Sequence, residues 1–356
     1  MTASPLEVSA LVDDVLFSFL GARAAVFSDA APLFAEIERM ARSGGKRLRP
    51  AFCIWGYRAG GGDDDGSVAR VAASLELLHT FAIIHDDVMD RSPLRRGQAS
   101  SYRELSATAG VRGDPERFGS SAAILVGDLA MALADELWWT ASFPADRVAD
   151  GASIYQAMRA EVIGGQYLDL LAGARGDATP EETRRISILK SGRYTVERPL
   201  QIGAALAGAG PDVRDALASF GAPLGEAFQI RDDLLGAFGD PGLTGKDAFA
   251  DLREGKQTLL VALARKNASP EQRATLDRSL GDADLDEAGA DAVRAVFIET
   301  GARDEVIDTV EGLVDAAHAA IETAALPPDA IAALRALADL VRAPRPLSGE
   351  GEKIAP

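Results

Sequence analysis

The chain has 356 residues, of which 47% are hydrophobic, so it is long enough to bury a sizeable core. Its formal net charge of −17 argues against a surface that binds nucleic acid, because such surfaces need a basic footprint. Cys53 is its single cysteine, which excludes an internal disulfide framework and favours a reducing, cytoplasmic compartment.

The N-terminal stretch "MTASPLEVSALVDDVLFSFL" does not have the pattern of a secretory signal peptide. It lacks a basic start and carries Asp13 and Asp14 before its apolar end. No uncharged run along the chain approaches the roughly 18 apolar residues of a membrane span. We therefore expect no transmembrane segment.

The spacing of apolar residues predicts helices along nearly the whole chain. Alanine and leucine recur at three- and four-residue intervals, as in "VARVAASLELLHTFAIIHDD", and alternating β-branched runs are scarce. Breaks are expected where Gly, Pro and Asp gather, as in "AGGGDDDGS" and "TAGVRGDPERFG". The pattern predicts an all-α fold with a single domain over residues 1–342 and a disordered tail over residues 343–356.

Charged residues gather at helix ends in the first third of the chain. "SGGKRLRP" places Lys46, Arg47 and Arg49 on a loop that starts with glycine and stops at proline. In "HDDVMD", Asp86 and Asp90 are four residues apart, so on a helix they project from one face about 6 Å apart. Carboxylate oxygens, completed by phosphate oxygens, are the ligands that Mg²⁺ prefers.

Two arginines follow this aspartate pair. Asp87 points about 100° away from the pair on a helix and is expected to play a supporting part. Arg95 and Arg96 come just past Pro93 and can bind an anion held by the metal, because guanidinium groups fit phosphate oxygens bidentately. A solvated basic loop is the alternative interpretation of the two arginines.

A second acidic cluster lies in "FQIRDDLLG", where Asp232 and Asp233 follow an apolar helix. The fifth position of this motif is Gly236 instead of aspartate. Asp240 is unsuited to replace it, because eight helical residues span about 12 Å.

Three lysines accompany the second cluster. Lys190 lies at a helix break in "ILKSGRYT", and Lys246 and Lys256 lie in the glycine-flanked turns "TGKD" and "EGKQ". Lysines suit phosphate neutralisation, although each alone is also compatible with an ordinary surface position. Together the two acidic helix ends and the cations predict a site that holds a diphosphate through Mg²⁺, above an apolar cavity for a hydrocarbon tail.

In their order along the chain, these motifs resemble the trans-isoprenyl diphosphate synthases, the head-to-tail chain-elongating prenyltransferases. The resemblance runs from about Gly44 to Thr258 and rests on "GGKRLRP", "ELLHTFAIIHDDVMD", "RRG", "ILVGD", "GGQYLDL", "KSGRYT", "FQIRDDLLG" and "GK…DLREGK". It implies an isoprenoid synthase helical bundle around a central apolar cavity, a homodimer, and three Mg²⁺ ions that bridge the allylic diphosphate to both aspartate motifs. The chain departs from the family pattern at Gly236 and in "QASSYRE", where many members have Pro-Thr-x-His.

The resemblance also implies roles for individual residues. Mg²⁺ would be bound by Asp86, Asp90 and Asp232, which form the catalytic set together with Lys190 and Lys246. The allylic diphosphate (dimethylallyl, geranyl or farnesyl) would be neutralised by Arg95, Lys190 and Lys246 and covered by Lys256. Isopentenyl diphosphate would be held by Lys46, Arg49, His79 and Arg96. Gln229 and Asp233 would support the helix of the second motif, and Gln166 and Asp169 would line the cavity nearby. Gln166 and Gln229 are also expected among the substrate-binding residues.

Residues upstream of Asp86 are expected to set the length of the product. Each added isoprene pushes the tail along this helix, past Ala82 and Phe81 and then Leu78. One aromatic beside a small residue predicts a floor of intermediate depth, as in geranylgeranyl diphosphate synthases; plain core packing of Phe81 and a farnesyl product are the alternatives.

The chemistry predicted for such a site leaves several interpretations open. The released diphosphate is expected to accept the proton lost after bond formation, while His85 and His318 are interpreted as structural and surface residues. A class I terpene cyclase would share the first motif, but its Asn/Asp-Asp-x-x-Ser/Thr-x-x-x-Glu pattern is not found in the sequence. A non-catalytic subunit of a heteromeric prenyl synthase is the remaining alternative.

Overall fold

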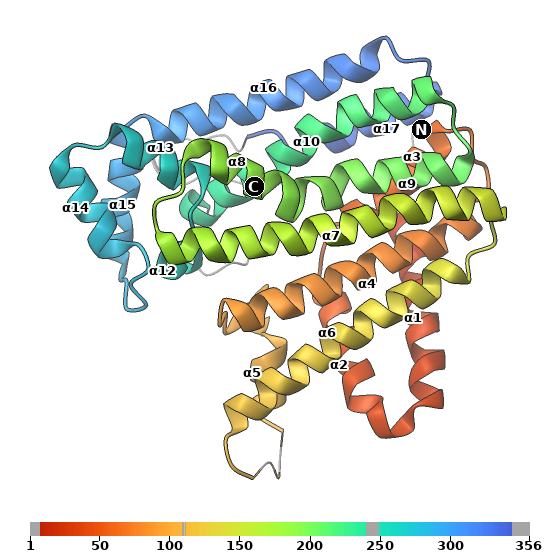
Figure 1. Cartoon of the computed structure of the whole chain (residues 1–356), viewed down its shortest axis with the longest axis horizontal. Coiled ribbons are helices and arrows are strands. Elements are labelled where there is room, and N and C mark those ends of the chain that lie inside the picture. The colour runs from red at the N-terminus through yellow and green to blue at the C-terminus, as the bar shows by residue number, and fades with distance from the viewer. Residues whose placement is uncertain (1–7, 109, 111, 240–248, 344–356) are drawn as a thin grey trace. The chain divides into compact units, whose positions relative to one another are not determined.

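The structure, a computed structural model, describes residues 8–108, 110, 112–239 and 249–343. The chain divides into two compact units. Unit 1 comprises residues 1–151 and 202–209, and unit 2 comprises residues 152–201 and 210–356. Helices make up most of the described chain and strands very little of it, which confirms the predicted all-α fold (Figure 1).

The elements of unit 1 are nearly all helical. They are α1 (Val8–Val26), the 3₁₀ helix η1 (Ser28–Ala30), α2 (Ala31–Arg42), α3 (Leu48–Ala59), α4 (Asp65–Met89), β1 (Leu94–Arg95), β2 (Gln98–Ala99), α5 (Ser101–Ser106) and α6 (Pro115–Trp139). The chain continues into unit 2 along α7 (Ala145–Arg175) and returns along α9 (Arg198–Ala207). Among the described residues, β1 and β2 are the only strands, and they pair antiparallel.

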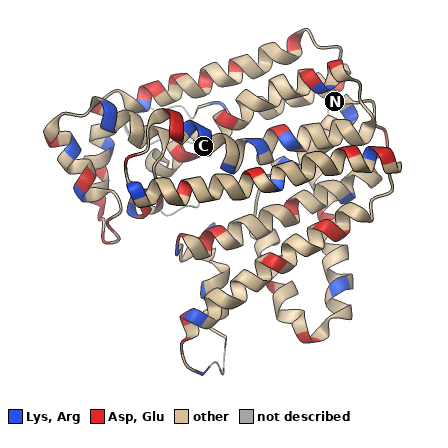
Figure 2. Cartoon of the chain, viewed as in Figure 1, with Lys and Arg blue, Asp and Glu red and all other residues tan. Residues whose placement is uncertain are grey.

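The remaining elements belong to unit 2. They are α8 (Pro180–Ser187), the π-helix η2 (Ile188–Glu197), α10 (Pro211–Phe238), α12 (Ala250–Glu254), α13 (Leu259–Asn267), α14 (Pro270–Ser279), α15 (Glu287–Glu299), α16 (Ala302–Glu322) and α17 (Pro328–Asp339). Acidic and basic positions are interspersed along most of the helices (Figure 2).

Helix α4, which carries the first aspartate motif, is the central helix of unit 1. It packs against α1, α2, α3, α5 and α6. Its N-terminus is capped by Asp64, whose carboxylate accepts a hydrogen bond from the amide of Ser67 at 3.2 Å. Its residues from Val68 to Phe81 are buried on almost every side, as expected of a helix that is apolar all round.

Helix α10, which carries the second motif, has the corresponding place in unit 2. It packs against α8, η2, α12, α13 and α16. It begins after Gly210 with Pro211. Proline is preferred in the first turn of a helix because an N–H group at that position would have no partner within the helix. The last turns, from Asp233 to Phe238, are buried. Each aspartate motif therefore lies where a core helix ends.

Two helices among the described residues are long and apolar enough to cross a membrane by length and composition, α4 and α6. The buried share of the most apolar 18-residue window is 72% in α4 and 39% in α6. Core helices of globular proteins meet the same criteria, so this finding is a weak indication of a span. The expectation of no transmembrane segment stays a prediction.

The C-terminal boundary was predicted at residue 342. The backbone amide of Ala343 donates a hydrogen bond to Oε1 of Glu311 at 2.7 Å, which attaches the end of the described chain to α16. The rest of the expected tail, residues 344–356, lies outside the described residues. The single domain over residues 1–342 also stays a prediction.

Candidate active site

The first aspartate motif lies at the C-terminal end of α4. The backbone amide of Asp90 donates to the carbonyl of Asp86 at 2.9 Å, an i to i+4 bond that places the two residues on one face, as the spacing predicted. Asp87 points away from this face and its side chain is fully buried.

Asp87 binds Arg95, which lies on β1. Nε of Arg95 donates to Oδ1 of Asp87 at 2.9 Å, and Nη2 of Arg95 lies 3.5 Å from Oδ2 of Asp86. Burial raises the pKa of Asp87 to about 6, although Arg95 opposes the shift. Asp87 therefore links α4, the helix of the first aspartate motif, to Arg95, which is predicted to bind the allylic diphosphate.

A two-residue turn between β1 and β2 presents the second arginine. Arg96 and Gly97 both have positive φ, 53° and 74°, as a type I′ hairpin turn requires. The guanidinium of Arg96 donates to the carbonyl of Gly44, in the loop that carries Lys46.

A cluster of cations surrounds His79, one of the residues predicted to bind isopentenyl diphosphate. His79 is buried, and burial together with the positive charges of Arg49, Arg96, Arg95 and Arg47 lowers its pKa well below the usual value. The structure thus brings three predicted ligands together in unit 1, while Lys46 lies exposed on the adjoining loop. A neutral imidazole among arginines suits a polyanion, to which it can donate a hydrogen bond.

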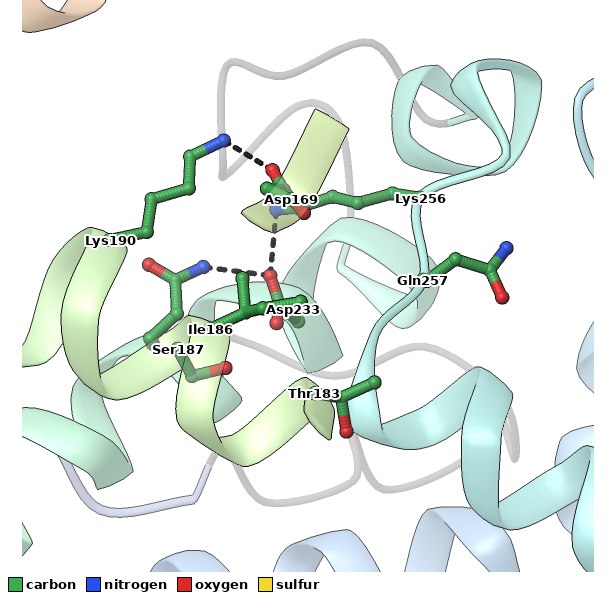
Figure 3. Close-up of a pocket in the computed structure, with 9 residues that line it drawn as sticks. Asp169, Thr183, Ile186, Ser187, Lys190, Asp233, Lys256 and Gln257 are labelled. Atoms are coloured by element: carbon green, nitrogen blue, oxygen red, sulfur yellow. Dashed lines mark hydrogen bonds and ion pairs between the residues drawn. The ribbon is translucent and has the colours of Figure 1, made fainter. Parts of the chain in front are cut away.

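Unit 2 contains a small pocket that is partly open to solvent. Its lining residues come from α7, α8, η2, α10 and the segment after α12: Asp169, Thr183, Ile186, Ser187, Lys190, Gln229, Asp233, Lys256 and Gln257. Figure 3 shows the charged side chains of this set turned toward one another. The predicted residues Lys190, Gln229 and Lys256 are therefore brought together in one pocket.

Each lysine of this pocket is paired with an aspartate (Figure 3). Nζ of Lys190 donates to Oδ2 of Asp169 at 2.6 Å, and Nζ of Lys256 donates to Oδ1 of Asp233 at 2.9 Å. Gln229 donates to the same oxygen of Asp233 at 2.8 Å. Burial disfavours the charge of Lys256, but the carboxylates around it outweigh this effect and raise its pKa well above the usual value.

The second motif has an unexpected neighbour at its fifth position. A Cβ atom on Gly236 would overlap Oδ2 of Asp251, which comes from α12. A side chain at position 236 would therefore require α12 or Asp251 to move. Asp232 is half-buried at the start of the motif, and Lys246 lies outside the described residues.

Lys190 belongs to the π-helix η2, a form of helix often found at functional sites. A Cβ atom on Gly165 of α7 would overlap the backbone of Lys190, and a Cβ atom on Gly192 would overlap the backbone of Gly225. Backbone atoms cannot rotate aside as side chains do, so these glycines are needed for η2 to approach α7 and α10 this closely. Gln166 follows Gly165 and is half-buried.

The proposed chain-length residues lie in α4. Leu78 and Phe81 are buried and Ala82 is half-buried. The ring of Phe81 packs edge-on against His85, with centroids 4.8 Å apart. Nε2 of His85 lies 3.0 Å from the carbonyl of Ile124 on α6, which supports the structural interpretation of this histidine.

The donor atoms suit Mg²⁺ bound together with a phosphate ligand. Among the described residues, no group of three or more His, Cys, Asp or Glu side chains is arranged to hold a metal ion. Mg²⁺ is normally bound by one or two carboxylates plus substrate phosphates and water, so the one-face pair Asp86 and Asp90 fits this ion. His318 lies elsewhere, on α16, where its ring nitrogen is 3.0 Å from Asp339.

Replacement of His79 by glutamine is expected to reduce the pH dependence of stability. Below pH 6.5 the unfolded chain takes up a proton on this imidazole that the folded chain resists, so the wild-type free energy of unfolding falls from pH 7 toward pH 5. The loss contributed by one such group is up to about 1.4 kcal/mol per pH unit. Urea unfolding at pH 7, 6 and 5 measures it; an equally steep fall in His79→Gln would contradict the prediction.

Adjacent glycines of α7 offer a matched pair of variants. Gly165→Ala is expected to lower the free energy of unfolding by about 1–3 kcal/mol, because its Cβ would overlap the Lys190 backbone. Gly164→Ala has open space around the new Cβ and is expected to leave stability unchanged or raise it by about 0.5–1 kcal/mol. Urea unfolding of both variants makes the comparison, and equal stabilities would refute the close contact.

Comparisons with known proteins agree with the motifs. The polyprenyl synthetase family model matches residues 31–296. Geranylfarnesyl diphosphate synthase of Aeropyrum pernix is 38% identical over 64% of this chain and 68% of its own length. (2E,6E)-farnesyl diphosphate synthase of Mycobacterium bovis is 36% identical over 61% of this chain and 56% of its own.

A solved structure extends the similarity to the fold. Geranylgeranyl pyrophosphate synthase from Corynebacterium glutamicum, crystallised with isoprenyl diphosphate and magnesium, superimposes with a TM-score of 0.92 at 35% identity. The match covers 95% of this chain and 99% of that one. The chain belongs to the polyprenyl synthetase family and is a trans-prenyltransferase of the isoprenyl diphosphate synthase type.

Proposed function

We propose that this enzyme is a geranylgeranyl diphosphate synthase, which condenses isopentenyl diphosphate with dimethylallyl, geranyl and farnesyl diphosphates. The observation that supports the condensation is that each aspartate motif has a cation bound directly beside it, whereas the geranylgeranyl length rests on Phe81 and Ala82 upstream of Asp86 on α4. Arg95 binds Asp87 next to Asp86, and Lys256 binds Asp233 next to Asp232. Farnesyl diphosphate is the alternative product.

Asp86 and Asp90 in unit 1 and Asp232 in unit 2 would bind Mg²⁺, with three ions per chain in all. Mg²⁺ supplies positive charge that stabilises the diphosphate as it leaves the allylic carbon. The lysines of the unit 2 pocket would add to this stabilisation once they contact the phosphate oxygens. We propose that Lys190 and Lys256 turn from their aspartates toward the phosphate oxygens when the ligand binds, and that Lys246 joins them.

The cation cluster of unit 1 would bind isopentenyl diphosphate. Arg49, Arg96 and Lys46 supply charge, and neutral His79 donates a hydrogen bond. Because His85 is engaged with α6, the released diphosphate would accept the proton lost after the new carbon–carbon bond forms.

Exposed apolar side chains support a homodimer. Unit 1 exposes Ile124, Leu125 and Trp139 on α6, and the α7 segment of unit 2 exposes Ile163 and Tyr167. Apolar side chains gathered on one helix face commonly mark a protein interface. We propose that a second copy of the chain covers these helices, and that the dimer works in the cytoplasm, where Cys53 would stay reduced.

A single assay tests the proposal. Purified protein is incubated with Mg²⁺, isopentenyl diphosphate and each allylic starter, and the products are identified by mass after dephosphorylation. Geranylgeraniol supports the proposal, farnesol supports the alternative, and cyclic hydrocarbons would identify a cyclase. Activity that appears only after another subunit is added would identify a non-catalytic partner.

Phe81→Ala is expected to lengthen the product, because it removes the ring that packs on His85 along the path of the growing tail. The control is Phe52→Ala, which removes a fully buried ring from α3 and should lower stability by about 3–5 kcal/mol without changing product length. Mass analysis of the prenyl alcohols compares the two variants. An unchanged product in Phe81→Ala would exclude this residue as the floor.

A further inference from the structure

Arg47 lies in the sequence between two cations predicted to bind isopentenyl diphosphate, yet its side chain points into the protein. Only 7% of it is exposed, whereas Lys46 is exposed and Arg49 is half-buried. Its backbone is left-handed, with φ of 49° and ψ of 40°, immediately before α3 begins. Residues other than glycine rarely adopt this conformation, so the surrounding contacts must hold it.

Those contacts come from three helices. Nε of Arg47 donates to Oδ1 of Asp13 on α1 at 2.8 Å, and Nη1 donates to Oε1 of Glu76 on α4 at 2.6 Å. Nη2 donates to the carbonyl of Ala41 on α2 at 2.8 Å. Burial disfavours the charge of Arg47, but the two carboxylates outweigh it and raise its pKa.

These contacts fix the direction of the loop that carries Lys46 and Arg49. Gly44 and Gly45 precede the loop, with φ of 111° and 136°. Glycine adopts such angles without steric cost, so these two residues do little to restrict the direction of the loop. A further restraint on the loop is the hydrogen bond from Arg96 to the carbonyl of Gly44. Glu76 also lies one turn before His79 on α4. The same helix therefore positions His79 directly and Arg47 through Glu76.

We infer that Asp13 and Glu76 are positioning residues for the isopentenyl diphosphate site: they hold Arg47 inward and so aim Lys46 and Arg49 at the diphosphate. This inference rests on the proposed function. The competing role for Arg47 is that of a direct phosphate ligand.

The Glu76→Gln variant separates the inward-held role of Arg47 from that of a direct phosphate ligand, because the two predict opposite changes in KM for isopentenyl diphosphate. As a positioning residue, Glu76 supports binding, so its loss is expected to raise KM for isopentenyl diphosphate about tenfold, with KM for the allylic substrate and kcat within about twofold. If Arg47 is a direct ligand, removal of the opposing carboxylate frees it and lowers KM for isopentenyl diphosphate. The inhibition constant of inorganic pyrophosphate against isopentenyl diphosphate should move with KM.

Three further variants complete the test. Asp13→Asn is expected to act like Glu76→Gln, and because Asp13 is partly exposed it decides the matter if Glu76→Gln does not fold. Arg47→Lys should also raise KM, since one ammonium cannot reach three partners in different directions. Glu38→Gln, the control, breaks the exposed pair with Arg42 on α2 and should leave both KM values unchanged.

The outcomes distinguish failure of the inference from failure of the proposed function. Unchanged or lower KM for isopentenyl diphosphate in both Glu76→Gln and Asp13→Asn would overturn the inference while condensation persists. If the wild type forms no linear product, the proposed function fails. Calorimetric titration with inorganic pyrophosphate then judges the inference: weaker binding in Glu76→Gln supports it, and equal or tighter binding overturns it.

Discussion

A charged side chain that leaves water must find an opposite charge, and this requirement governs how an acidic protein can keep cations ready for a polyphosphate. With a net charge of −17, the chain has carboxylates to spare, and it places one against four of the cations in or beside the candidate site. The pairs are Arg47–Glu76, Arg95–Asp87, Lys190–Asp169 and Lys256–Asp233.

The pairs differ in how far they can open. Arg47 and Glu76 are both buried, so their separation would leave two charges without solvent. Lys190 and Lys256 are partly exposed, at 18% each, and their flexible stems can turn toward another anion. A magnesium-bearing diphosphate carries both signs of charge. It can therefore replace a carboxylate as the partner of a lysine while its metal attracts carboxylates nearby.

Features set by neighbouring residues could be predicted from the sequence. Helical periodicity gave the all-α fold, and the four-residue spacing placed Asp86 and Asp90 on one face. Gln229 and Asp233 are related by the same spacing and are hydrogen-bonded. The roles of these residues in metal and substrate binding are proposals.

Features that join distant segments could not be predicted. Arg47 looked like one of three cations on a loop, and only its contacts with distant segments, such as Asp13 and Glu76, show that it points inward. The overlap of Asp251 with a side chain at position 236 likewise depends on how α12 returns to α10. No local pattern records such contacts, because they arise from packing between elements.

The π-helical segment Ile188–Glu197 has a consequence for how the sequence can change over time. A π-turn accommodates one more residue than an α-turn, so it can originate by a one-residue insertion in an α-helix. Loss of one residue from this segment would convert a π-turn to an α-turn and leave the helices on either side in register. The same loss from a regular α-helix would rotate all that follows by about 100°. Related sequences should therefore tolerate a single-residue deletion in this segment better than in the α-helices that flank it.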